Sequence, residues 1–437
     1  MIKKLVLVFI ALSAIQSFAQ SGTSASPYSF YGIGSLKFKG TVENRSMGGL
    51  SIYSDSIHIN LRNPASYGGE NLSSYNNENR PVTFAIAASH TRVSLKSEVS
   101  KDNLKNTSLD YLALSIPIGK LGVGIGLIPY TSVGFKLETL TENGDINERF
   151  DGSGGLNRTY LSAGYPITKE LSVGVDFSFY FGNIKNNTIK YLYNSQGDLL
   201  QYQTREKNLS ELSGFSANVG LIYKTTLNKK YNFYSGLTFQ PEAKLNSNNE
   251  RELSTIVINP NNGQEIVLNT IDAGLKEEGL ENTSSNIPYR LSLGAGIGQE
   301  RIWFVGAEFT YANLENFSNE FNVDNGTNYE NSSSIAVGGF IIPKYNAFES
   351  YFKRMVYRAG LRYEETGLNI NNESIDEFGI SFGVGLPVGT DFFSNANLGF
   401  EFGRRGTTAS NLVQENYFKF QISLSLNDLW FKKRRYN

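Results

Sequence analysis

The feature that most constrains this chain is a two-residue alternation of apolar and small or polar side chains. Between residues 171 and 181 every second side chain is apolar, and Ser, Gly, Asp and Tyr stand between them. Residues 377–388 and 418–427 follow the same pattern. Side chains of a strand point alternately to its two faces, so each run predicts a strand with one apolar face. Most runs have about 9–11 residues or more, enough for a tilted strand to cross a bilayer and longer than a typical soluble strand.

Runs of this kind predict about 14 strands after the first 81 residues, which is the even number typical of an antiparallel outer-membrane barrel. The connections alternate between short turns and mostly longer polar loops, the asymmetry between the periplasmic and extracellular ends of such a barrel. A soluble β-sandwich is the alternative, but its strands are usually shorter. We therefore predict an all-β transmembrane barrel over residues 82–437. The predicted strands are 82–95, 107–118, 120–136, 156–166, 171–186, 203–226, 231–246, 286–299, 301–314, 332–342, 354–364, 377–388, 395–403 and 415–427.

The first residues have the pattern of a secretory signal peptide. Lys3 and Lys4 precede the apolar stretch 5–15, and Ser-Phe-Ala at 17–19 is a small-x-small cleavage pattern. The apolar stretch is too short to span a bilayer. We therefore predict a signal peptide over residues 1–19 and export from the cytoplasm.

Residues 20–81 do not alternate and are rich in Gly, Ser and Asn, with short apolar stretches between them. A barrel of about 14 strands leaves an aqueous lumen unless something fills it. We therefore predict that residues 20–81 form a hatch, or plug, inside the lumen. A free periplasmic tail is the alternative, but it would leave the apolar residues of this segment without a core.

Composition removes several classes of function. There is no Cys and there are only 2 His, so neither a thiolate site nor a multi-His metal centre is predicted, and no cofactor is expected. A formal charge of −1 gives no footprint for nucleic acid. An acyl hydrolase would need Ser and His held together, whereas His90 is predicted on the lipid face and His58 in the hatch. An enzyme is therefore not expected.

Three features resemble the FadL family of outer-membrane transporters for hydrophobic compounds, including its PorV-like relatives attached to type IX secretion. The strand count is one. The second is a small-residue turn at 47–49 followed by Asn63-Pro64-Ala65, which is similar to the family's hatch pattern. The third is Pro288 with Arg290 at a strand start. The chain departs from the family at its end, 429–437, where a terminal strand Phe is missing.

The resemblance implies a monomeric barrel in the cell outer membrane, surrounded by outer-membrane lipid. It implies passive transport of hydrophobic, fatty-acid-like small molecules, with the hatch blocking an open channel and a lateral exit where a strand kinks. Lateral exit avoids moving apolar surface through water, at about 25 cal/mol per Å². Two alternatives stay open. One is a non-transporting barrel subunit of a type IX secretion machine, which co-purification of a partner would favour, and the other is a polar-solute porin, which steady large conductance would favour.

Charged residues at inward-facing register positions are the candidate lumen and ligand sites. The simplest interpretation is that they wet the lumen and pair with each other and with the hatch. A sharper hypothesis is that Arg358 and Arg362 bind a ligand carboxylate or clamp the hatch. Asn63, Pro64 and Ala65 are expected to fix the path of the hatch, although an ordinary Asn-Pro turn is an equal alternative. The inward charges are Asp176, Arg290, Glu308, Arg358, Arg362 and Glu401.

Overall fold

The computed structural model describes residues 26–37, 39–68, 80–98, 100–259, 262–314, 317, 321, 327–388 and 394–428. The predicted signal peptide, residues 1–19, lies outside the described residues, and so does the C-terminal end that departs from the FadL pattern. No helix in the described part of the chain is long and apolar enough to cross a membrane.

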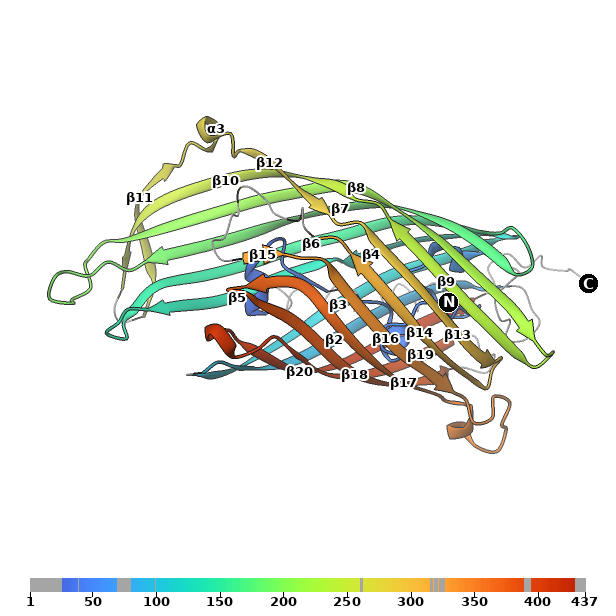
Figure 1. Ribbon diagram of the computed structural model, residues 1–437. Helices are drawn as coiled ribbons and strands as arrows, with labels where there is room; N and C mark the ends of the chain where they lie inside the picture. The colour runs from blue at the N-terminus through green and yellow to red at the C-terminus, as the bar shows by residue number, and fades with distance from the viewer. Residues whose placement is uncertain are drawn as a thin grey trace, which may run out of the picture.

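The chain forms a closed antiparallel barrel of 14 strands, which confirms the predicted fold class (Figure 1). Closure is made by the first and last wall strands, whose antiparallel ladder runs from Val82 opposite Asp428 to Lys96 opposite Gln414. Four further short elements, β11 (Glu265–Asp272), α3 (Leu275–Glu278), η5 (Tyr351–Arg354) and η6 (Ala409–Asn411), lie in the connections. The wall strands are β2 (Val82–Lys96), β3 (Lys101–Ile118), β4 (Leu121–Pro129) continued by β5 (Thr131–Leu140), β6 (Ile146–Pro166), β7 (Leu171–Lys190), β8 (Gln203–Leu227), β9 (Tyr231–Gln240) continued by β10 (Ala243–Ile258), β12 (Asn282–Ile287) continued by β13 (Arg290–Gln299), β14 (Trp303–Ala312), β15 (Thr327–Tyr329) continued by β16 (Ser332–Ile341), β17 (Val356–Ile370), β18 (Glu373–Val388), β19 (Ser394–Arg405) and β20 (Gln414–Asp428).

The two faces of the wall follow the alternation seen in the sequence. On β7 the side chain of Phe177 is 62% exposed, while its neighbours Asp176 and Ser178 are buried in the lumen. Phe215 on β8 is 76% exposed on the same outer face. A closed barrel with an apolar outer belt and a polar interior is the form in which strands cross a membrane. The protein is therefore an outer-membrane β-barrel.

Several strands run farther than the apolar alternation predicts. β6 begins at Ile146, and the polar connection expected over residues 247–285 contains the second half of β10, the whole of β11 and α3, and part of β12. Above the bilayer a hairpin needs no apolar outer face, so its ladder continues through polar residues. The apolar period detects only the part of each strand that lipid surrounds.

The described part of the N-terminal segment, residues 26–68, packs against inward-facing residues of the wall. Four short elements form it: η2 (Pro27–Phe30), β1 (Ser35–Leu36), α2 (Val42–Arg45) and η3 (Pro64–Tyr67). η3 contacts β4, β6, β7 and β8, whereas α2 contacts β18, β19 and β20. In Figure 1 these elements, coloured blue, lie between the walls of the barrel. The segment therefore contacts strands on widely separated parts of the wall.

The wall has a break on one side of β3. Residues 112–118 of β3 pair with β4, but β5 pairs with β6 and with β1 instead. Among the described residues, the part of β3 from Lys101 to Tyr111 has no ladder partner on that side. Pro129 ends β4, and Gly154 and Gly155 of β6 have φ of +120° and +139° opposite the kink. Proline cannot donate to the ladder, and positive φ suits glycine, so these residues locally bend the wall.

Candidate functional site

The Asn63-Pro64-Ala65 turn is held against the wall by both side chain and backbone. Asn63 Oδ1 accepts a hydrogen bond from the Ala65 N–H at 3.0 Å, which caps η3. Its Nδ2 donates to the Leu221 carbonyl at 3.0 Å on β8. A Cβ added to Gly174 of β7 would lie 2.3 Å from the Pro64 carbonyl carbon, so only glycine leaves room there. The three predicted hatch residues therefore meet the wall directly.

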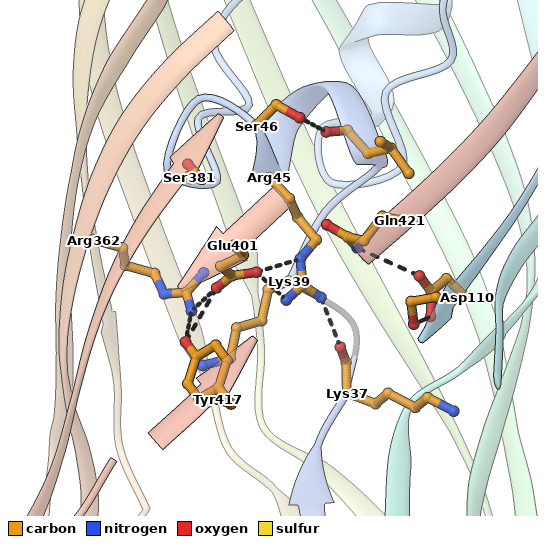
Figure 2. Close-up of polar contacts among 12 residues, drawn as sticks. Lys37, Lys39, Arg45, Ser46, Asp110, Arg362, Ser381, Glu401, Tyr417 and Gln421 are labelled. Carbon is orange, nitrogen blue, oxygen red and sulfur yellow. Dashed lines mark hydrogen bonds and ion pairs between the residues drawn. The ribbon is translucent and has the colours of Figure 1, made fainter. Parts of the chain in front are cut away.

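A network of alternating charges joins the N-terminal segment to β17, β18 and β19 (Figure 2). We call it the central ion cluster; it consists of Lys39, Arg45, Arg362, Glu364, Glu377 and Glu401. Arg45 Nη2 lies 2.6 Å from Glu401, and Arg362 Nη2 lies 2.8 Å from the same carboxylate and 2.6 Å from Glu377. Lys39 Nζ lies 2.6 Å from Glu364 and 2.8 Å from Glu377. Arg362 and Glu401, predicted separately, are thus brought together, and Arg45 links them to the plug.

Each charge in the central ion cluster has an oppositely charged partner, so these side chains remain ionised although they are away from water. Burial alone would lower the pKa of Arg45, but the adjacent Glu401 carboxylate outweighs burial and raises that pKa. Breaking a buried pair by removing one partner typically costs about 3–5 kcal/mol, because a charge is left uncompensated. The cluster therefore holds the segment in one place.

The other predicted lumen charges lie apart from this cluster. Glu308 pairs with Arg62 of the N-terminal segment at 2.8 Å and accepts from the Ser51 N–H at 2.7 Å. Asp176 pairs within the wall, with Arg158 at 2.9 Å. Arg358 and Arg290 take part in neither of these ion pairs.

Arg358 donates to Asn397 Oδ1 at 3.1 Å, and Arg290 lines the central cavity described below. Arg358 and Arg362 lie on the same face of β17, yet only Arg362 joins the ion cluster. The shared face was readable from register, whereas the difference between the two arginines was not.

Several residues of the N-terminal segment that bind the wall were not singled out from sequence. Lys39, Arg45 and Arg62 supply the cations for wall carboxylates, and Glu43 accepts from Asn397 and Ser423. Their partners are hundreds of residues away, so local spacing carries no signal for them. The signal that could have identified them is the presence of charged residues in a segment that otherwise consists largely of small and polar residues.

His58 and Asp55 form a second buried pair within the N-terminal segment. Their Nδ1 and Oδ2 atoms are 2.9 Å apart, and Asp55 also accepts from the Ile57 and His58 backbone N–H groups. Burial alone would lower the pKa of His58, but the Asp55 carboxylate outweighs it and raises the pKa. Burial would raise the pKa of Asp55, yet His58 and the two backbone donors lower it overall. Both shifts favour the ionised form of the pair.

Three layers follow each other inside the barrel. A cavity of about 770 Å³ is lined by charged residues at the loop end of β5 to β10, among them Lys136, Lys207 and Glu252. An apolar cluster that includes Ile33, Phe135 and other side chains of these strands packs beside it. A central cavity of about 110 Å³ is lined by charged and polar residues. The lumen is therefore filled rather than open, with apolar packing next to polar cavities.

A further cavity of about 130 Å³ lies at the break in the wall. We call it the break cavity. β1 forms one side of it, where Ser35 pairs with Ser132 of β5, and the unpaired part of β3 contributes Leu104, Asn106 and Ser108. The break cavity shares Leu36 and Lys39 with the lining of the central cavity. Space inside the lumen thus extends to the place where the wall is incomplete.

Comparison with known proteins gives one family and one fold. The family model described as BamG matches residues 1–437. The search of curated proteins found no match to this sequence. This family name differs from the FadL family predicted from sequence motifs, so the FadL likeness rests on structure.

Solved structures with a similar fold include two toluene transporters and a FadL homologue. The toluene transporter TbuX of Ralstonia pickettii aligns with a TM-score of 0.59 at 14% identity, over 90% of this chain and 99% of that chain. The toluene transporter TodX of Pseudomonas putida gives 0.56 at 17% identity, over 90% and 99%. A FadL homologue of Pseudomonas aeruginosa gives 0.55 at 11% identity, over 90% and 98%. At these identities the likeness establishes the fold.

Proposed function

Since this chain belongs to the BamG family and forms an outer-membrane barrel with an incomplete wall, we propose that it passively carries hydrophobic small molecules sideways through the break between β3 and β5. The proposal rests most on that break, because an unpaired strand edge in the wall is costly unless it serves a purpose. The toluene transporters of the same fold add support for the class of cargo. Functionally, the chain would be a FadL-type transporter, and fatty-acid-like molecules are the cargo we favour.

The layers of the lumen support a route for such molecules. A ligand would collect in the cavity lined by Lys136, Lys207 and Glu252, pass its apolar part into the cluster around Phe135, and leave at the break cavity. Each step keeps apolar surface out of water, which is worth about 25 cal/mol per Å². Residues 20–81 would act as the hatch that stops free flow of water. The hatch role of Asn63, Pro64 and Ala65 belongs to this proposal.

The lumen charges would have a structural role under this proposal. Arg362, Glu401 and Glu308 fix the hatch, whereas Asp176 pairs with the wall. Arg290 and Arg358 remain candidates for ligand contact. A polar-solute porin is disfavoured, because the central cavity holds only about 110 Å³ among tightly paired charges.

Uptake by cells tests the function. Cells that express the protein should accumulate radiolabelled hexadecanol faster than cells that lack it. Ser108→Trp, which fills the break cavity, should reduce uptake to the level of cells without the protein. Thr159→Trp adds the same bulk to the lipid face of β6 and should leave uptake unchanged. Equal uptake with and without the protein would contradict the proposal.

A second candidate is a barrel subunit of a larger membrane assembly, such as a type IX secretion machine. The loop between β16 and β17 leaves Phe348 94% exposed and Phe352 70% exposed. Beside it, an apolar recess of about 770 Å³ on the outer wall is floored by Gly339 and Ala359. Small residues let another membrane protein approach closely. If the protein does not transport, Phe348→Ser with Phe352→Ser should release a partner that co-purifies with the wild type.

A further inference from the structure

The strand β11, at the loop end of the barrel, has an open edge. It pairs with residues 252–258 of β10 on one side, and no other strand in the described part of the chain pairs with it. In Figure 1 β11 lies at the margin of the extended strands, with α3 next to it. A strand at the edge of a sheet presents unpaired N–H and C=O groups, to which another chain can add.

The backbone of Val267 points to this open edge. At the start of the ladder Asn259 N–H donates to the Gln264 carbonyl at 2.9 Å, so these two residues form a hydrogen-bonded pair. Hydrogen-bonded and non-hydrogen-bonded pairs alternate along an antiparallel ladder. Val267, opposite Ile256, is three pairs farther along and therefore directs its N–H and C=O away from β10.

The side chains of β11 are apolar and exposed, although the strand lies beyond the apolar belt of the wall. From Lys244 to Glu250 the exposed side chains of β10 are all polar. At about 3.4 Å per residue this polar stretch is roughly 20 Å long, so lipid does not cover β11. A row of exposed apolar side chains in water marks a site where another protein binds. The four side chains, 44% to 61% exposed, are Ile266, Val267, Leu268 and Ile271.

The two faces of β11 suit a partner strand that alternates in the same way. By register Ile266 and Ile271 share one face, whereas Val267 and Asp272 lie on the other. Side chains directly opposite each other on neighbouring strands interact. An added strand with apolar residues at every second position would therefore cover the two isoleucines.

The charge around β11 indicates which partner fits. Residues 265–281 include five acidic residues and one basic residue, a formal charge of −4. Glu265 pairs with wall arginines, whereas Glu277 and Glu278 of α3 are exposed. Two copies of this edge would repel each other, and a basic segment would be attracted.

We propose that β11 is a docking edge for an extended, basic segment of another protein, which adds to it as one more strand. The backbone of the segment would bond to Val267, and its apolar side chains would cover Ile266 and Ile271. In this mode of recognition the main-chain ladder gives affinity and the alternate side chains give specificity. The inference goes beyond the proposed function and does not depend on the cargo.

Binding of a labelled peptide to the purified full-length protein in dodecyl maltoside tests the proposal, by fluorescence anisotropy. The peptide alternates lysine and valine over eight residues, the length of β11. One control peptide has glutamate in place of lysine, and another has all the lysines before all the valines. The alternating basic peptide should bind about tenfold or more tightly than either control, because like charges repel and a blocked sequence cannot match the alternation.

Variants of the edge separate strand addition from general attraction. Val267→Pro removes the N–H at the open edge, where proline is tolerated in an edge strand, and should weaken binding about tenfold or more. Val267→Ala keeps this N–H and should change binding about threefold or less. Glu277→Gln with Glu278→Gln should weaken binding of the basic peptide about threefold or more. Glu349→Gln, at an exposed carboxylate in the connection between β16 and β17, should not change it.

Amide hydrogen exchange of the wild type decides the test if a variant does not fold. The peptide should slow exchange at Val267 and leave Ile266, whose N–H already faces β10, unchanged. Unchanged exchange at Val267, equal binding of the basic and acidic peptides, or full binding by Val267→Pro overturns the inference. A wild-type dimer that Val267→Pro dissociates also overturns it, since a second copy would then be the occupant.

Uptake of hexadecanol keeps this inference separate from the proposed function. A protein with normal uptake that fails the peptide test refutes this inference only. A protein that binds the peptide through Val267 but does not speed uptake refutes the proposed function only.

Discussion

The N-terminal segment contacts opposite sides of the lumen in different ways. Against β16 to β18 it packs backbone to backbone: a Cβ on Gly360 would lie 2.1 Å from the Met47 carbonyl carbon, and Gly48 N–H donates to Ser381 Oγ at 3.0 Å. Toward the break it pairs with β5 through the two residues of β1. No hydrogen bond joins the described residues of the segment to residues 101–109 of β3. The segment is thus anchored on one side and leaves a strand edge uncovered on the other.

This difference teaches how a plugged barrel can keep an opening. Charges and close packing fix the plug to β16 to β19, and the Asn63-Pro64-Ala65 turn fixes it to β7 and β8, so the unpaired edge of β3 need not hold it. Changes to the contacts that hold the N-terminal segment should therefore differ in the size of their effect.

Removing the Glu401 carboxylate, which Arg45 and Arg362 share, should have the largest effect on stability. Glu401→Ala leaves Arg45 and Arg362 buried without this partner and should lower the free energy of unfolding by about 3–5 kcal/mol. The shift of the folded barrel on unheated SDS gels over a temperature series measures it. Glu365→Ala, at an exposed carboxylate of β17 that bonds Ser333, should change stability by less than about 0.5 kcal/mol. Equal shifts for both variants would show that the cluster is not an anchor.

A larger side chain at Gly360, where β17 lies against Met47, should have the next largest effect. Gly360→Leu forces Met47 away from β17 and should cost about 1–3 kcal/mol, as overpacking usually does. Limited proteolysis should then cut within residues 26–68, which the wild type protects. Ala359→Leu places the same side chain on the lipid face of the adjacent position and should remain protected. Protection in both variants would mean that the segment does not depend on this contact.

The smallest effect should come from pH, through His58. Its pKa is raised in the folded protein, so its stabilising contribution is complete below the unfolded value of about 6.5. That contribution is lost as the pH rises through the folded pKa, which weakens the Asp55 pair. Amide hydrogen exchange at residues 57 and 58, corrected for intrinsic rates, should therefore speed up as the pH is raised above the unfolded value of about 6.5 and through the folded pKa. His58→Gln should abolish this dependence, and a dependence that persists in it would contradict the assignment.

Most of the wall was predictable from sequence, because lipid imposes a two-residue period. The run from 171 to 186 and its observed strand β7 (Leu171–Lys190) show how closely an apolar face marks a strand. The kink was missed because 120–136 reads as one continuous run, although Pro129 was a signal. The apolar period did not predict the polar extension of β10 to Ile258, because no lipid faces that part of the strand.

The interior was less predictable. Register placed Glu401 and Arg362 in the lumen, but no local pattern links Glu401 to Arg45, which is 356 residues away. Ion pairs between a plug and a wall depend on how the barrel closes, and this is set by the whole chain.

Photolabelling tests the central claim, that hydrophobic molecules leave through the break, most directly. The full-length protein in native outer membranes would be labelled with a diazirine analogue of hexadecanol, and the modified residues identified by mass spectrometry. The account predicts labels on Leu104 and Val93, which line the break cavity. It also predicts that Ser108→Trp abolishes these labels. Labels confined to outward residues such as Phe177 and Phe215 would contradict it.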